Sequence, residues 1–147
     1  LDVAGDLRLL ARGAASDGYD FDGASPTKRV GESVGLGGRL RLVADDIELA
    51  SVVRLPSGSI EVEARDGDVR LGAGAVLDVA GQLRRFDTRL TGTEGGSVSL
   101  HAATGDVVLD AGSVIDVAGT AVDARNVAAA GEVELRAPGS EVAFAAG

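Results

Sequence analysis

Apolar and polar residues alternate over two long stretches of the chain, residues 58–81 and 96–119. A period of two is typical of β-strands, whose successive side chains point to opposite faces. Glycine tolerates the positive φ of a tight turn, and it recurs between the alternating segments. The corners are Gly67-Asp68, Ala73-Gly74, Gly105-Asp106 and Ala111-Gly112. The pattern therefore predicts short strands joined by tight corners.

One set of alternating positions must face an interior, because the other set carries the charges. The inward set is apolar throughout and has no aromatic member, which predicts a thin core of Val, Leu and Ile. The predicted inward residues are Ile60, Val62, Val69, Leu71, Leu77, Val79, Val98, Leu100, Val107, Leu109, Ile115 and Val117.

The two stretches are copies of one another. Aligned without a gap, Gly58–Gly81 and Gly96–Gly119 are identical at 14 of 24 positions and start 38 residues apart. Weaker copies open at Gly38 and Gly131, and the phrase Leu-Asp-Val-Ala-Gly at Leu1–Gly5 recurs 76 residues later, at twice that spacing. A fixed spacing with like residues at like corners is typical of stacked repeats rather than of a sandwich of hairpins.

Half of the 38-residue spacing is about 19 residues, enough for three short strands and three corners of a parallel β-solenoid. The chain then forms a single all-β segment, residues 1–147, of about seven coils. Val69 and Val107 share an interior column in this scheme, with other coils between them. The least regular segment, Thr120–Ala130, is rich in Ala and free of Gly, which allows one or two turns of helix.

The longest departure from the repeat is an insertion near residues 11–37. Acidic and aromatic residues lie close together in it, a combination suited to stacking on sugar rings or to anchoring a protein contact. Loops that project from a rigid scaffold often carry binding sites. The candidate partner-binding residues are Asp17, Tyr19, Asp20, Phe21 and Asp22. The alternative is that the two aromatic side chains fold back over the flank of the rod.

Composition removes several classes of function. The 14 Lys+Arg against 23 Asp+Glu give a net charge of −9, which opposes nucleic acid over most of the surface. With no cysteine and one histidine, His101, neither a disulfide scaffold nor a thiolate zinc site can form. No stretch has the roughly 18 apolar residues of a membrane span, and the first residues show no signal-peptide pattern. We expect the chain to be a piece of a longer protein, because it begins within a repeated phrase.

Two neighbouring carboxylates could indicate a glycoside hydrolase. Such enzymes use one carboxyl group as the general acid and a second as the general base or the nucleophile. Asp45 and Asp46 are adjacent, but Asp46 aligns with Asp68 and Asp106 at a recurrent corner, which favours a structural role. His101 falls on the outer face by alternation, which argues against a Ser-His-Asp triad. The sequence therefore predicts no catalytic residue.

Metal and phosphate sites find equally little support. Asp17, Asp20 and Asp22 precede a glycine as in a calcium loop, but the first and twelfth ligand positions of an EF-hand are not acidic. A solvated acidic loop is the simpler interpretation, and an adventitious calcium site is the alternative. Gly35–Gly38 lacks the strand, helix and Lys of a phosphate loop. We expect no metal and no cofactor.

Two phrases, GGRLRLVADDIELA from Gly37 and GGSVSLHAATGDVVLDAGSVIDVAG from Gly95, resemble the filamentous haemagglutinin family of large exoproteins, over roughly residues 38–144. The resemblance implies a right-handed parallel β-helix, export through an outer-membrane partner by two-partner secretion, and a place on the cell surface of a Gram-negative bacterium. The secretion domain of that family carries Asn-Pro-Asn motifs. This chain has one asparagine, Asn126, and so resembles the repetitive shaft.

The expected function is therefore a structural and binding segment of a secreted, filamentous adhesin without catalysis of its own. Its expected partners are neighbouring coils of the parent polypeptide or other copies end to end, and a host-cell glycan or protein receptor. No nucleic acid or membrane insertion is expected. A β-helical polysaccharide hydrolase or lyase, and the shaft of a contact-dependent inhibition toxin, are the alternative interpretations.

Overall fold

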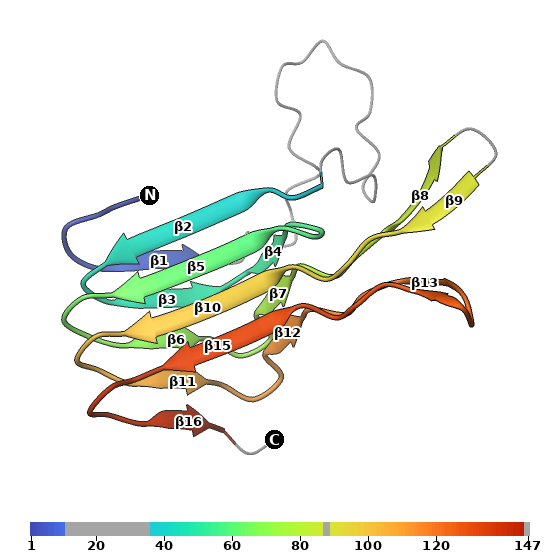
Figure 1. Ribbon diagram of the computed structural model, residues 1–147. Helices are drawn as coiled ribbons and strands as arrows, with labels where there is room; N and C mark the ends of the chain where they lie inside the picture. Colours follow the sequence, from blue (N-terminus) through green and yellow to red (C-terminus); the bar gives the residue numbers. More distant parts are fainter. Residues whose placement is uncertain (11–35, 87–88, 146–147) are drawn as a thin grey trace, which may run out of the picture.

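The computed structural model describes residues 1–10, 36–86 and 89–145, and within these ranges the chain is all β, without a helix. Most strands belong to three parallel sheets, here named sheets A, B and C, and the others form two antiparallel hairpins. Sheet B lies behind sheet A with the core between them, and the hairpins project beyond sheet C (Figure 1). The prediction of an all-β chain with mainly parallel strands is confirmed.

The strand bounds follow the repeat. Sheet A contains β2 (Arg39–Ala44), β5 (Ser59–Ala64), β10 (Ser97–Ala102) and β15 (Glu132–Arg136). Sheet B contains β1 (Leu7–Leu10), β3 (Ile47–Ala50), β6 (Val69–Leu71), β11 (Val107–Leu109) and β16 (Val142–Phe144). Sheet C contains β4 (Val52–Arg54), β7 (Val76–Asp78) and β12 (Val114–Asp116). The hairpins are β8 (Leu83–Phe86) with β9 (Arg89–Gly92), and β13 (Ala121–Asp123) with β14 (Asn126–Val127).

The chain passes through sheets A, B and C in turn, and we call each such passage a unit. Successive units are β2-β3-β4, β5-β6-β7 and β10-β11-β12, followed by β15 and β16. Equivalent strands pair in parallel and in register, so that Val98 lies between Ile60 and Val133. Each unit thereby satisfies the backbone N–H and C=O groups of the next one.

Inward positions stack on inward positions and form the core. All twelve predicted inward residues lie in the core or pack against it, which confirms the alternation. Leu109, Ile115 and Val117 are only partly buried. Ile115 lies on β12, the edge strand of sheet C, with Val117 just beyond it, and only β16, the edge strand of sheet B, lies beyond Leu109. A column of small aliphatic side chains needs no aromatic residue to fill it.

The predicted count of about seven coils of about 19 residues is wrong. β2 and β5 start 20 residues apart, whereas β5 and β10 start 38 apart. Val69 nevertheless pairs directly with Val107, so no unit lies between them. The additional residues leave the stack as the β8–β9 hairpin. Arg84 and Arg85 occupy both faces of β8, so this strand has no apolar face with which to line the interior.

The repeated phrase at Leu1–Gly5 also proves misleading. Asp2 bridges to Val43, and the N–H of Val3 donates to the Val43 carbonyl oxygen, so this segment extends sheet A beside β2. The matching phrase at Leu77–Gly81 starts in sheet C instead. A short alternating peptide fits any sheet of the stack, and its pairing partner decides which sheet it joins.

Thr120–Ala130 forms the β13–β14 hairpin and not the helical turns that its composition allows. Asp123 makes the turn, because its carboxylate accepts the N–H groups of Arg125 and Asn126 at 2.8 and 2.9 Å. Such local side-chain bonds compete with helical hydrogen bonds and favour turns.

We expect the acid titration of Asp123 to report this turn. Hydrogen bonds from the backbone N–H of Arg125 and from the side-chain amide of Asn126 lower the pKa of the Asp123 carboxyl. A lowered folded-state pKa stabilises the turn above the unfolded pKa, and this contribution is lost as the pH falls through the folded pKa. Carboxyl chemical shifts should titrate lower in the native protein than in the urea-unfolded chain. Equal midpoints would contradict the turn.

Candidate functional site

The five candidate partner-binding residues predicted from the sequence, Asp17, Tyr19, Asp20, Phe21 and Asp22, lie outside the described residues. The described chain resumes at Leu36, next to Gly37, which has a φ of 74° and donates its N–H to the Pro56 carbonyl oxygen at 3.0 Å. The predicted insertion therefore falls in the chain between β1 and β2.

The aligned aspartates form a ladder at the corner between sheets A and B. One carboxylate oxygen of Asp46 accepts the N–H of Asp68 at 2.9 Å, and Asp68 accepts the N–H of Asp106 at 2.8 Å. The Asp106 carboxylate in turn accepts the N–H of Glu141 at 2.9 Å. We call Asp46, Asp68 and Asp106 the Asp ladder. Each carboxylate caps the backbone of the next unit, which is the structural role that the alignment predicted.

Asp45 also binds a backbone amide through its carboxylate. Its carboxylate accepts the N–H of Gly5 at 2.8 Å and lies 3.9 Å from Arg65. The carboxylates of Asp45 and Asp46 therefore bind backbone amides of different segments, and do not act together on one bond as a glycosidase pair must.

The glycines beside the Asp ladder are required by close packing. Gly67 and Gly105 were expected to supply a positive φ, but neither is among the glycines with one. A Cβ on Gly67 would overlap the Asp46 carboxylate, and one on Gly105 would overlap Asp68. At the next corner the prediction holds, since Gly74 and Gly112 have φ values of 73° and 76°.

We expect Asp68→Ala to lower the free energy of unfolding by about 1 kcal/mol, because the N–H of Asp106 loses its acceptor. Asp68→Asn keeps an acceptor oxygen and should cost less. Urea unfolding followed by circular dichroism would measure both. An Asn variant as destabilised as the Ala variant would contradict a hydrogen-bonding role.

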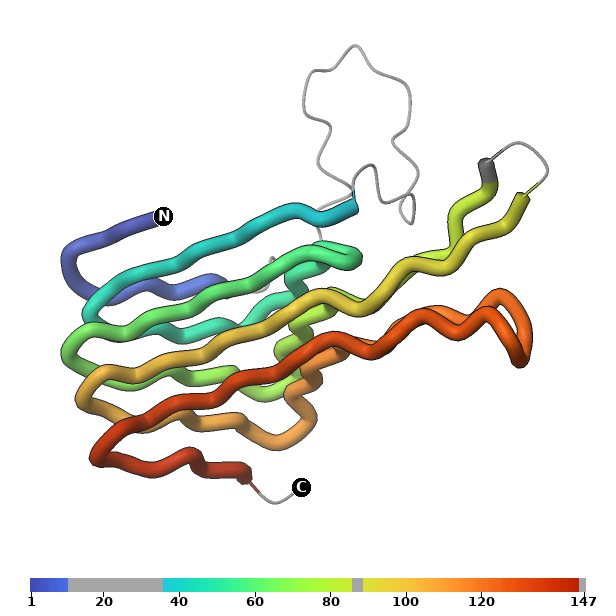
Figure 2. Tube along the Cα trace, viewed as in Figure 1, coloured from blue at the N-terminus to red at the C-terminus, as the bar shows by residue number. Residues whose placement is uncertain are grey.

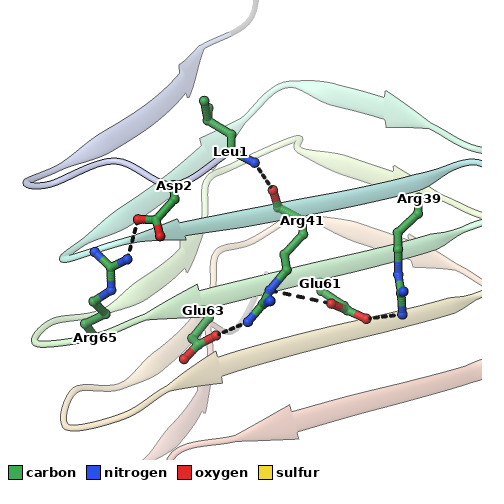
Figure 3. Close-up of polar contacts among 7 residues, drawn as sticks. All are labelled: Leu1, Asp2, Arg39, Arg41, Glu61, Glu63 and Arg65. Atoms are coloured by element: carbon green, nitrogen blue, oxygen red, sulfur yellow. Dashed lines mark hydrogen bonds and ion pairs between the residues drawn. The ribbon is translucent and has the colours of Figure 1, made fainter.

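The outer face of sheet A carries ion pairs between neighbouring strands (Figure 3). Arg39 lies 2.7 Å from a carboxylate oxygen of Glu61. Arg41 lies 3.0 Å from Glu63 and 3.7 Å from Glu61. Exposed pairs of this kind contribute about 0–1 kcal/mol each. Between β2 and β5, the opposite charges of these pairs neutralise one another.

Further ion pairs lie over the rest of the outer surface. They join Arg8 to Glu48, Arg54 to Asp78, Arg65 to Asp2, Arg70 to Asp110 and Arg136 to Glu134. The two hydrogen bonds from Arg70 to Asp110, at 2.8 and 3.0 Å, raise the pKa of the arginine. Hydrogen bonding to Asp2 likewise raises the pKa of Arg65.

His101 is half-buried on β10, in register with Glu63 on β5 and Arg136 on β15. Its orientation agrees with the outward placement that alternation predicted. Register places it beside these two charged residues. The Thr104 hydroxyl, three residues further along the chain, donates to the Asp66 carbonyl oxygen at 2.7 Å and not to the imidazole. No Ser-His-Asp hydrogen-bond chain occurs among the described residues.

A shallow hollow of about 490 Å³ crosses the start of the sheet A strands. Its lining is mostly backbone and small side chains: Gly37, Ser57–Ser59, Gly95–Ser97 and Ala130–Glu132. Glu132 is the single titratable side chain in this lining, so the hollow offers no acid and base together. Within the described ranges, no three His, Cys, Asp or Glu side chains gather as metal ligands. Nor does any helix there have the length and apolarity to cross a membrane.

Comparison of the chain with family models, with curated proteins and with solved structures gave no match.

Proposed function

We propose that this chain is a structural and binding segment of a secreted filamentous adhesin, in which the units are coils of a right-handed parallel β-helix. The observation that supports this best is the in-register parallel stacking of like strands from unit to unit. Such stacking makes a stiff support that can lengthen by adding units.

The outer faces favour a supporting role over catalysis. Cross-strand ion pairs join β2 and β5 of sheet A, and the Asp ladder ties the carboxylates of the first corner to backbone amides. Repeated faces with paired charges give solubility and stiffness but little discrimination between partners. In the proposal, a host-cell glycan or protein receptor is bound by the candidate residues of the predicted insertion rather than by the repeated faces. These residues are Asp17, Tyr19, Asp20, Phe21 and Asp22.

We also propose where the segment lies in its parent protein and in the cell. Its stack continues onto neighbouring coils of the parent polypeptide or onto other copies end to end, and an outer-membrane partner exports the parent to the cell surface of a Gram-negative bacterium. The resemblance of residues 38–144 to the filamentous haemagglutinin family supports both.

Adhesion of coated beads tests the binding part. Beads that carry the chain should bind epithelial cells or spots of a glycan array, and replacing the five candidate residues by Ser should abolish binding while the β-sheet circular dichroism stays unchanged. A variant with the same five residues in shuffled order is the control for loop composition. Beads that bind neither cells nor glycans would contradict an adhesin, and release of reducing sugar from a polysaccharide panel would replace it by a hydrolase.

A further inference from the structure

The two hairpins leave the stack at the same place in successive units and lie side by side at their bases (Figure 2). The N–H and the hydroxyl of Thr120 donate to the Thr93 carbonyl oxygen at 3.3 and 2.9 Å, which joins β13 to the end of β9. We call β8, β9, β13 and β14 together the hairpin platform.

Hydroxyl groups fix the base of the hairpin platform to the stack. The Ser57 and Thr93 hydroxyl oxygens lie 2.7 Å apart, and Ser57 also donates to the Glu94 carbonyl oxygen at 2.7 Å. The N–H of Gln82 donates to the Thr93 hydroxyl at 2.8 Å. This network holds the platform in one orientation, so that its side chains project from a fixed base.

The arginines of the platform differ from those of the sheets. Among the described residues, every arginine in sheets A, B and C and the connecting corners has a carboxylate partner: Arg8, Arg39, Arg41, Arg54, Arg65, Arg70 and Arg136. Arg85, Arg89 and Arg125 of the platform are exposed and make no such pair with any described residue. In a chain of net charge −9, the guanidinium groups of the described residues that lack a carboxylate partner thus lie on the two hairpins of the platform.

Exposed aliphatic side chains accompany these arginines. Leu83, Leu90 and Val127 are 48%, 40% and 67% exposed. Arg85 is directly opposite Leu90 in the β8–β9 register and shares the face of Leu83, two residues away. Arginine next to exposed apolar area is the composition of protein-binding surfaces, which are enriched in arginine relative to the rest of the surface.

We propose that the hairpin platform binds a short acidic segment of another protein, with a carboxylate on Arg85 and apolar side chains on Leu83 and Leu90. Arg89, on the opposite face of the β8–β9 ribbon, and Arg125 of the second hairpin add positive charge around this contact. A guanidinium matches a carboxylate with two parallel hydrogen bonds. A short segment meets the platform alone, whereas a flat anionic membrane or a long nucleic acid would also approach the acid-rich sheets and be repelled. This inference is independent of the proposed adhesin function, because it uses neither the candidate insertion residues nor a host receptor.

Fluorescence anisotropy with a labelled short Glu/Leu peptide tests the proposal at low salt. The wild-type chain should bind the peptide, and the triple variant R85Q/R89Q/R125Q should bind about tenfold or more weakly. The matched control R8Q/R54Q/R70Q removes the same charge from arginines that already have carboxylate partners, and it should bind as the wild type does. Circular dichroism confirms that each variant is folded.

Other outcomes would overturn the platform as an acidic-peptide site. These are no binding by the wild type, an equal loss in both triple variants, or binding of duplex DNA or phosphatidylglycerol vesicles in place of the peptide. Leu83→Ser separates recognition from charge alone, since it should weaken the Glu/Leu peptide and leave the weaker binding of polyglutamate unchanged. An equal effect on both probes would contradict the apolar contact.

Discussion

Val107→Asp is expected to lower the free energy of unfolding by more than about 3 kcal/mol. Val107 is 0% exposed and stacks between Val69 and Val142 in sheet B. The core has no buried polar or charged side chain among the described residues, so the new carboxylate would find no partner. Because the column is lined on both sides by other units, the side chain cannot turn to water without breaking the pairing of β11.

Val108→Asp is the matched control. Val108 is the next residue on the same strand, lies on the outer face beside Arg70 and is half-buried. The same carboxylate there is expected to change the free energy of unfolding by less than about 1 kcal/mol. Thermal or urea unfolding followed by circular dichroism compares the two. Equal melting curves for the two variants would contradict the inward assignment of Val107.

Alternation made the core predictable because it is a local property. Each strand is short, and the residues that must face inward, such as Val62 and Leu100, are distinguished from their neighbours without reference to any other strand. Stacking then brings like residues together, so the alignment of Gly58–Gly81 with Gly96–Gly119 also predicted which residues share a column. It placed other coils between β5 and β10, however, and these two strands pair directly. The role of the aligned aspartates followed for the same reason.

The number of units could not be read from the period, because a repeat counts residues and does not distinguish strands in the stack from strands that leave it. The sequence did hold a signal. Arg84, Arg85 and Arg89 break the alternation of apolar and charged positions, and a strand with charge on both faces cannot line a core. The same break marks the hairpin platform, which the sequence interpretation passed over in favour of the insertion near residues 11–37.

The contrast between paired and unpaired arginines links these observations to function. On the sheets, register fixes which side chains are neighbours. An outward arginine such as Arg39 therefore forms an ion pair with a glutamate of the next strand, which neutralises its charge. A hairpin that leaves the stack also leaves that register. Arg85 and Arg125 therefore lack a carboxylate partner among the described residues and can pair with an acidic segment of another protein. The departure of the hairpins from the repeat thus creates the proposed binding surface.

The glycines at the start of the sheet A strands should be the least replaceable residues of the stack. A Cβ on Gly96 would overlap the carbonyl oxygen of Gly58, and one on Gly131 would overlap that of Gly96. Both contacts are with backbone of a neighbouring unit, which is held by in-register pairing and cannot move aside alone. Gly96→Ala is therefore expected to lower the free energy of unfolding by about 3 kcal/mol, the upper end of the range for overpacking.

Gly74→Ala separates this packing effect from backbone strain. Gly74 has a φ of 73°, but a Cβ there meets nothing within 4 Å. The cost should be the strain of a left-handed residue alone, about 1–2 kcal/mol. Urea unfolding of Gly96→Ala and Gly74→Ala measures the difference in their free energies of unfolding. Because both variants replace glycine by alanine, that difference reflects the surroundings of the two positions. If Gly74→Ala proved the more damaging of the two, the close stacking of glycine backbones at the start of sheet A would be contradicted.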